Sequence, residues 1–250
     1  MSLVFVFPGK GSQSVGMGKE LAKDFKVAAD VFREIDEALG QNLSSLIWEG
    51  PKEELTLTEN AQPALMAVSL AVMRVLEKEK GFLLKERVTY VAGHSLGEYS
   101  ALAAAGAFSL TDTAKLLKLR GQAMQRAVPV GIGAMTALLG VDLETAKNIT
   151  KAAAQGDVCE IANDNEPTQV VLSGHKSAID RVPEVGKSLG LRRSIPLPVS
   201  APFHCSLMLP AQKEMSSALS KISICTPSVP LICNVLASEV LEPEQLRQCL

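Results

Sequence analysis

The feature that most constrains the fold of this chain is an apolar run that leads directly into a turn containing two glycines. Residues 88–92 (Val-Thr-Tyr-Val-Ala) are followed at once by Gly-His-Ser-Leu-Gly at 93–97, and residues 98–105 are mostly small. A short apolar run that ends at glycine predicts a buried strand, and the small-residue stretch predicts a closely packed helix. A buried strand that turns sharply into a helix is typical of α/β proteins with a parallel sheet.

The turn itself has the pattern G-x-S-x-G, which carries a specific chemistry. Two glycines allow a sharp strand-to-helix turn without Cβ clashes, and the turn lifts the oxygen of Ser95 out of the sheet. Backbone N–H groups at the start of the following helix then lie beside that oxygen and can hold an oxyanion. We interpret Ser95 as a nucleophile; the alternative is a tight turn with a purely structural role.

A serine nucleophile needs a base, and the chain has three histidines. His94 neighbours Ser95, so its side chain leaves the turn in another direction, and we expect it to be packed and hydrogen-bonded. His175 follows a predicted strand and is expected in a surface loop. His204 lies in a proline-flanked loop and follows Ser95 in the chain, as in α/β-hydrolase-type sites, so we predict that it is the base.

Two other features leave alternatives open. The turn at 8–13 (Pro-Gly-Lys-Gly-Ser-Gln) is not a nucleotide motif, because Ser14 stands where G-x-G-x-x-G needs glycine. It is either a plain strand-to-helix turn or a loop that gives a backbone N–H to the oxyanion hole. Arg120, near the end of a predicted helix, is either a solvated residue that complements the helix dipole or a fork for a substrate carboxylate. The residues alone favour the solvated arginine.

Composition excludes several classes of protein. The chain has 250 residues with a net charge of −2, so no strong basic field is available to hold nucleic acid or an anionic membrane. Its five cysteines include no C-x-x-C pair, so neither a disulfide framework nor a metal site is expected. No apolar run has the length of a membrane span or the form of a secretion signal. We expect a cytoplasmic protein.

Apolar spacing predicts the remaining elements of a large α/β domain. The run at 3–7 predicts a strand buried on both faces. A helix is expected to begin with Pro63 at its first position. Further elements are listed together: helices at 17–39, 63–78, 110–127 and 210–221, and a strand at 231–235.

Near residue 128 the pattern changes to short strands and helices. The strands are predicted at 133–140, 158–163, 169–174 and 191–197, with helices at 142–155 and 177–189. Their order, β-α-β-β-α-β, is the ferredoxin-like pattern. We therefore predict a large domain of residues 1–127 and 199–250 with an inserted ferredoxin-like subdomain of residues 128–198.

Six stretches of the chain match a known family, in the family's order. They are Phe-Val-Phe-Pro-Gly-Lys-Gly-Ser-Gln at 5–13, Asn-Ala-Gln-Pro-Ala at 60–64, Gly-His-Ser-Leu-Gly-Glu-Tyr at 93–99, Arg-Gly-Gln-Ala-Met at 120–124, Asn-Asp-Asn at 163–165 and Phe-His-Cys at 203–205. In these stretches the chain resembles the malonyl-CoA:acyl carrier protein transacylases, the acyltransferase family of fatty-acid and polyketide synthesis.

The resemblance implies an α/β-hydrolase-like large domain and ping-pong acyl transfer by a Ser–His dyad. Ser95 takes malonyl from coenzyme A, with His204 as general base and then general acid. The phosphopantetheine thiol of acyl carrier protein then attacks the acyl-enzyme. Arg120 matches the family arginine that pairs with the malonyl carboxylate, so the resemblance reverses the reading as a solvated residue.

The resemblance also implies the supporting residues. Backbone N–H groups of Leu96 and Lys10 form the oxyanion hole. Other implied substrate-binding residues are Gln62, Asn163, Asn165 and Phe203, the last of which favours malonyl over methylmalonyl by crowding the α-substituent. No metal or other cofactor is implied, and the expected partners are malonyl-CoA and acyl carrier protein, with the protein itself a monomer.

The chain departs from the family pattern at two places. Lys10 replaces a glutamine; its N–H remains, so we expect the change to be tolerated. The chain ends at Leu250, before the usual family terminus, whose final part normally supplies a closing strand and helix and a carbonyl that orients the histidine.

Two rival functions stay open. One is a serine hydrolase or thioesterase on the same turn, which does not need Arg120. The other is a truncated, non-catalytic domain that binds coenzyme A or carrier protein.

Overall fold

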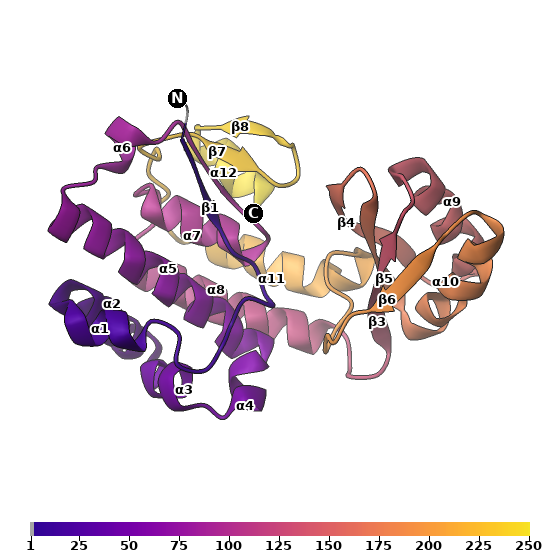
Figure 1. Cartoon of the computed structure of the whole chain (residues 1–250), viewed down its shortest axis with the longest axis horizontal. Helices are drawn as coiled ribbons and strands as arrows, with labels where there is room; N and C mark the ends of the chain where they lie inside the picture. Colours follow the sequence, from indigo (N-terminus) through magenta and orange to yellow (C-terminus); the bar gives the residue numbers. More distant parts are fainter. Residues whose placement is uncertain (1–2) are drawn as a thin grey trace. The chain divides into compact units, whose positions relative to one another are not determined.

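A computed structural model describes residues 3–250 of the chain. The chain divides into two compact units: unit 1, of Met1–Gly121 and Met215–Leu250, and unit 2, of Gln122–Glu214. Both divisions fall inside helices, after Gly121 in the second half of α8 (Leu110–Ala127) and in the middle of α11 (Leu209–Leu219). Each unit is described separately below, and Figure 1 labels the elements of both.

Unit 1 contains a sheet with the strand order β1-β2-β7-β8. The strands are β1 (Val4–Phe7), β2 (Tyr90–Gly93), β7 (Leu231–Cys233) and β8 (Ser238–Val240). The first three are parallel, with Phe7 opposite Gly93 and Ala92 opposite Ile232, and β8 is antiparallel to β7. The predicted parallel sheet is therefore present, with β2 at its centre.

Helices make up most of the rest of unit 1. Besides α8 and α11 they are α1 (Lys19–Asp24), α2 (Lys26–Leu39), α3 (Leu43–Glu49), α4 (Lys52–Thr56), α5 (Thr58–Lys80), α6 (Leu84–Arg87), α7 (Leu96–Ala104) and α12 (Pro243–Cys249). Helix α7 contacts β1, β2 and α5, and its residues from Leu96 to Leu102 are all buried. A helix enclosed in this way must be built from small or apolar residues, which explains the run of alanines after the glycine turn.

Three sequence predictions for unit 1 were wrong in detail. The run at 3–7 was expected to be buried on both faces, but Val4 is 43% and Val6 72% exposed, so the face of β1 that carries these alternate residues is largely open. The single helix at 17–39 is two helices, because Phe25 adopts extended dihedral angles between them. Helix α5 begins at Thr58, so Pro63 lies inside it and not at its first position.

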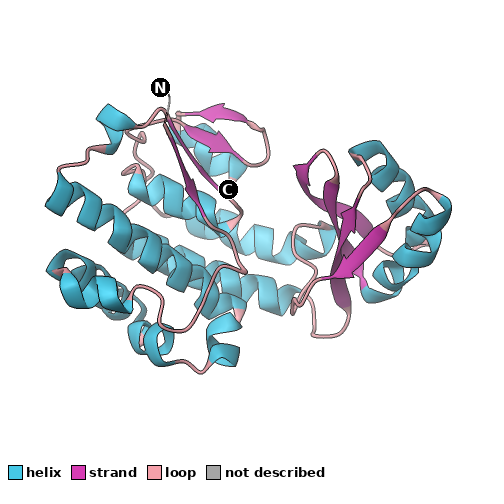
Figure 2. Cartoon of the chain, in the orientation of Figure 1, coloured by secondary structure: helices cyan, strands magenta, loops and turns pink. Residues whose placement is uncertain are grey.

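Unit 2 has the element order β3-α9-β4-β5-α10-β6, the strand and helix order predicted from the sequence. The bounds are β3 (Gly133–Leu139), α9 (Leu143–Ala154), β4 (Cys159–Glu166), β5 (Gln169–His175), α10 (Lys176–Ser188) and β6 (Arg193–Pro196). The sheet order is β4-β5-β3-β6, and every pair in it is antiparallel. Helices α9 and α10 pack against each other and against this sheet, as Figure 2 shows.

Two apolar clusters stabilise unit 2. One lies between the sheet and its two helices and contains Leu138, Ile149 and Leu172. The other joins the end of α8 to the segment after β6 and includes Met124 and Phe203. That segment continues through the short 3-10 helix η1 (Ser206–Met208) into α11. None of the helices in the described part of the chain is long and apolar enough to cross a membrane.

Candidate active site

Ser95 occupies the sharp turn between β2 and α7 that the motif predicts. Its φ of 54° and ψ of −110° are unusual for a residue other than glycine. The flanking glycines have a steric reason: a Cβ on Gly93 would collide with the backbone of Gly97, and a Cβ on Gly97 would collide with the carbonyl oxygen of Phe7. The two glycines therefore let α7 pass directly over the ends of β1 and β2, with Ser95 at the crossing.

Backbone donors surround this turn. Leu96 is the first residue of α7, where N–H groups have no acceptor within the helix and the helix dipole is positive. The loop after β1 packs against the turn as well, since a Cβ on Gly9 would lie 2.7 Å from Nδ1 of His94. Lys10, the next residue of that loop, is partly buried, and desolvation lowers the pKa of its ammonium group. The site can hold an anion near Ser95.

The side chain of Arg120 is directed toward Ser95. The residues alone favoured a solvated arginine, and that interpretation was wrong. The Nη2 of Arg120 donates to Oγ of Ser95 at 3.1 Å, and its Nη1 donates to Oε1 of Gln62 at 2.8 Å. The guanidinium carbon lies 5.6 Å from the centre of the Tyr99 ring, at cation–π distance. Desolvation lowers the pKa of Arg120, while Tyr99 and Glu98 favour its charged form. An arginine remains charged under these conditions.

Gln62 holds this guanidinium in place. Its side chain is 2% exposed, and its Nε2 donates to Oγ1 of Thr58 at 3.1 Å, one turn earlier in α5. Gly121, which follows Arg120 in α8, allows α8 to approach α5 closely, because a Cβ at position 121 would collide with the backbone of Thr58 and Glu59. Gln62 is thus in the site, joined to Ser95 through Arg120.

His204 lies in unit 2, on the segment between β6 and η1. It is half-buried, and its φ of 60° is again unusual for a residue other than glycine. Two residues further on, Ser206 donates from its backbone nitrogen (2.7 Å) and from its hydroxyl (2.6 Å) to the carboxylate of Glu160 in β4. Glu160 therefore fixes the segment that carries His204.

The remaining predicted residues of unit 2 are less informative. Phe203 is 7% exposed and packs in the cluster with Met124. Asn163 is half-buried on β4, and Asn165 is exposed, with Nδ2 3.4 Å from Oε1 of Gln169. Their roles in substrate binding stay predictions.

The other two histidines differ from expectation. His94 was expected to be packed and hydrogen-bonded, but it is exposed, with its Nδ1 beside Gly9 of the loop after β1. His175 was expected in a surface loop, but it ends β5 and precedes α10, and its Nδ1 accepts a hydrogen bond from the Val158 nitrogen at 3.0 Å.

Sequence reasoning missed two residues beside the turn, Glu98 and Asn234. Glu98 is 5% exposed, and its carboxylate accepts a hydrogen bond from the backbone of Asn234. The only available signal was a carboxylate within an otherwise small and apolar helix.

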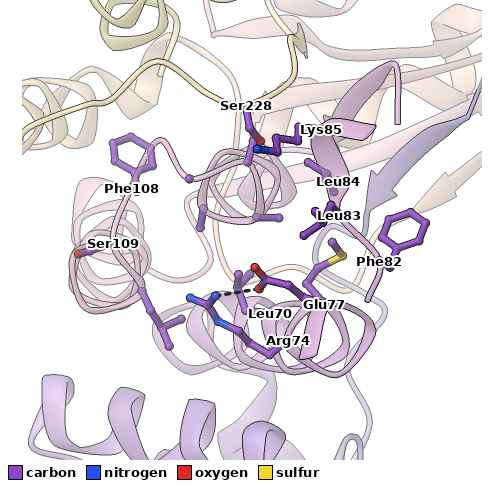
Figure 3. Close-up of a pocket in the computed structure, with 16 residues that line it drawn as sticks. Leu70, Arg74, Glu77, Phe82, Leu83, Leu84, Lys85, Phe108, Ser109 and Ser228 are labelled. Atoms are coloured by element: carbon purple, nitrogen blue, oxygen red, sulfur yellow. Dashed lines mark hydrogen bonds and ion pairs between the residues drawn. The ribbon is translucent and has the colours of Figure 1, made fainter. Parts of the chain in front are cut away.

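Unit 1 also has a cavity of about 430 Å³ that lies away from these residues and is lined by the second half of α5, by residues around α6 and by the end of α7. Figure 3 shows Leu70, Arg74 and Glu77 projecting into it from α5, with Lys85 and Ser228 across from them. None of the predicted site residues lines it, and Ser95 is at the opposite end of α7. Within residues 3–250, no group of His, Cys, Asp or Glu side chains is arranged to hold a metal ion.

Comparisons with known proteins identify the family of this chain. The family model described as the acyl transferase domain matches residues 4–249. Among curated proteins, the malonyl CoA-acyl carrier protein transacylase of Bacillus subtilis is 46% identical over 98% of this chain and 76% of its own length. The protein of the same name from Escherichia coli K12 is 44% identical over 92% of this chain and 74% of its own length.

Solved structures give the same result. An acyl-carrier-protein S-malonyltransferase from Bartonella henselae has a TM-score of 0.96 and 51% identity, and covers 100% of this chain and 79% of that one. A malonyl-transacylase in complex with a type II PKS acyl carrier protein has a TM-score of 0.94 and 41% identity, with 100% of this chain and 79% of that chain covered. The chain is an acyltransferase, and it belongs to the acyl transferase family in the branch of the malonyl-CoA:acyl carrier protein transacylases.

Proposed function

We propose that this protein transfers a malonyl group from malonyl-CoA to the phosphopantetheine thiol of an acyl carrier protein in fatty-acid synthesis, through an acyl-enzyme on Ser95. Family membership supports the substrates and the overall reaction. The observation that carries the mechanism is the strained turn that presents Ser95 to the guanidinium of Arg120.

In the first half-reaction, Oγ of Ser95 attacks the thioester carbonyl of malonyl-CoA while His204 removes the serine proton. The tetrahedral intermediate places a negative charge on the carbonyl oxygen, which accepts hydrogen bonds from the backbone N–H groups of Leu96 and Lys10. The C–S bond then breaks, and the thiol of coenzyme A leaves with the proton from His204. A malonyl ester on Ser95 remains.

The second half-reaction runs the same steps in reverse order with a new thiol. His204 takes the proton of the phosphopantetheine thiol, and the sulfur attacks the ester carbonyl. When the C–O bond breaks, Ser95 recovers its proton from His204. The products are malonyl-acyl carrier protein and free enzyme.

Arg120 selects the acyl group. A guanidinium offers two parallel N–H bonds to a carboxylate, and it is already held on one side by Gln62 and stacked over Tyr99. Such a pre-positioned cation favours the free carboxylate of malonyl over a neutral acyl group, and the bound carboxylate replaces Ser95 as its acceptor. Ser95 is thereby released for attack.

The finer architectural expectations belong to this proposal. The parallel strands and nucleophile turn of unit 1 support an α/β-hydrolase-like description, and the sheet order β4-β5-β3-β6 with two helices supports a ferredoxin-like description of unit 2. Pocket roles for Asn163, Asn165 and Phe203 are included, as is a reaction without a metal or other cofactor. The monomeric state and cytoplasmic location stay predictions.

The test is the intact mass of the protein after brief mixing with malonyl-CoA, with Ser95→Ala as control. We expect a malonyl adduct on the wild type alone and its transfer on addition of holo-acyl carrier protein, but not of apo-protein, which lacks the thiol. If the adduct is lost by hydrolysis as fast without carrier protein as with it, the protein is a hydrolase. If folded wild-type protein forms no adduct, the remaining function is that of a non-catalytic domain that binds coenzyme A or carrier protein.

A further inference from the structure

The peptide group between Gly93 and His94 is held from both sides. Its N–H donates to the carbonyl oxygen of Phe7 in β1 at 3.1 Å. Its carbonyl oxygen, on Gly93, accepts a hydrogen bond from the side-chain Nδ2 of Asn234 at 2.7 Å. This peptide follows the last residue of β2 and is separated from the strained residue Ser95 only by His94, so its orientation sets the direction in which the turn begins.

Asn234 takes over from the sheet at this point. The parallel pairing of β2 with β7 ends at Ala92 opposite Ile232, so the Gly93 carbonyl lies beyond the backbone ladder. Asn234 follows β7 directly, and its amide supplies the donor that a further strand residue would have supplied. Because Asn234 is exposed, these hydrogen bonds and not burial hold its side chain there.

Glu98 in turn holds Asn234. Its carboxylate oxygen Oε1 accepts a hydrogen bond from the Asn234 backbone nitrogen at 3.0 Å, from a position in the first turn of α7 where only 5% of its surface is exposed. A buried carboxylate is retained at a cost unless it is hydrogen-bonded, so its place here has a specific use. It ties the start of α7 to the residue that pins the end of β2.

These contacts close a ring around the nucleophile: Gly93, Ser95 and Glu98 lie on one continuous segment, and Asn234 bridges its two ends. Sparsely populated dihedral angles persist only where the surroundings over-determine them. We infer that Asn234 and Glu98 are positioning residues, which fix the Gly93–His94 peptide on one side of Ser95 and the first turn of α7 on the other, and thereby direct the serine oxygen. The inference rests on the proposed role of Ser95 as nucleophile.

The first experiment compares Asn234→Ala with Asn148→Ala, an exposed asparagine of α9. Two rates are measured: single-turnover malonylation by intact mass, and labelling of Ser95 by phenylmethylsulfonyl fluoride, which needs the serine but not the malonyl pocket. We expect Asn234→Ala to lower both rates about 10- to 100-fold, the range for a misaimed group, with an unchanged KM for malonyl-CoA and an unchanged melting temperature. Asn148→Ala should match the wild type.

The second experiment uses Glu98. Glu98→Gln keeps an oxygen that accepts from Asn234, whereas Glu98→Ala removes it, so we expect the glutamine variant to retain the labelling rate and the alanine variant to lose it. If Asn234→Ala does not fold, Asn234→Asp, which keeps the shape but lacks the N–H donor, replaces it with the same expectation. Wild-type labelling by folded Asn234→Ala or Asn234→Asp, or equal rates for the two Glu98 variants, overturns the inference.

The two reagents separate this inference from the proposed function. Wild-type protein labelled at Ser95 by the sulfonyl fluoride, but not by malonyl-CoA, contradicts the malonyl donor and leaves the positioning role testable by labelling alone. Wild-type protein that neither reagent modifies contradicts both.

Discussion

The side chain of Arg120 donates a hydrogen bond to the hydroxyl oxygen of Ser95 at 3.1 Å. The residue expected to recognise substrate is therefore in direct contact with the residue expected to react. In the free enzyme this bond satisfies a cation in a largely desolvated position, and a carboxylate that enters can replace it with two charge-assisted bonds. Substrate recognition and release of the nucleophile are then one exchange of partners.

Replacing Arg120 by alanine should remove the preference for a carboxylated acyl group. Loss of two charge-assisted hydrogen bonds, each about 1.5–3 kcal/mol, corresponds to a fall of about 100-fold or more in malonyl loading. Loading from acetyl-CoA should not fall, because acetyl has no carboxylate. The measurement is competitive loading by intact mass, with Arg126→Ala as control, since Arg126 is on the same helix as Arg120 and its ion pair with Glu214 of α11 is exposed. An equal fall in loading from malonyl-CoA and from acetyl-CoA would contradict the proposed role of Arg120 in binding the carboxylate.

Replacing Gln62 by glutamate should harm malonyl loading more than replacing it by alanine. The glutamate carboxylate would lie where Oε1 now accepts from Arg120 at 2.8 Å, and it would neutralise the cation that malonyl needs. Alanine only removes a support and leaves the charge of Arg120 available. The KM for malonyl-CoA of the two variants decides this; a glutamate variant that loads malonyl better than the alanine variant would be inconsistent with it.

Replacing Gly97 by alanine should destabilise the fold severely. The added Cβ would collide with the Phe7 carbonyl, which is rigid backbone, so α7 would have to move off β1. We expect a loss of about 3 kcal/mol or more in the free energy of unfolding, measured by urea denaturation. Gly81→Ala is the matched control. The φ of 61° at this position is strained for alanine, but no atom lies within 4 Å of the added Cβ, so we expect a loss of about 1 kcal/mol in the free energy of unfolding. Similar losses for both would show that the clash is not decisive.

Replacing Glu98 by glutamine should stabilise the protein at neutral pH. Burial raises the pKa of Glu98 above its ordinary value of 4.5. Its contribution to stability is therefore full below the unfolded pKa and is lost as pH rises through the folded pKa. The melting temperature of Glu98→Gln should exceed that of wild type at pH 7, with a gap that closes toward pH 4. Glu144→Gln, at an exposed position of α9, should show no such gap.

The nucleophile turn could be predicted because its requirements are local. Gly93, Ser95 and Gly97 lie within five consecutive positions, and their spacing alone predicts a sharp strand-to-helix turn. The structure contains this turn. The bounds of α8, expected at 110–127, were likewise correct, because its apolar spacing is regular.

The surroundings of the turn could not be predicted in the same way. The contact of Arg120 with Ser95 depends on the crossing of α8 and α5 at Gly121, which is a tertiary fact with no local pattern. The hydrogen bonds of Asn234 join residues far apart in the sequence. The start of α5 was misplaced because a proline normally marks the first turn of a helix, whereas buried packing keeps Pro63 in the interior.

The exposed edge strand β1 has a consequence for handling the protein in solution. Val4 and Val6 face outward on a strand whose outer backbone groups are unpaired within residues 3–250, and an apolar groove of about 330 Å³ runs beside them along α5. An open, apolar strand edge is a template for pairing with another chain. In a preparation of the polypeptide of residues 1–250 at the concentrations used for crystallisation or NMR, this short segment is where self-association would begin, and Val6→Lys would suppress it without touching the residues that surround Ser95.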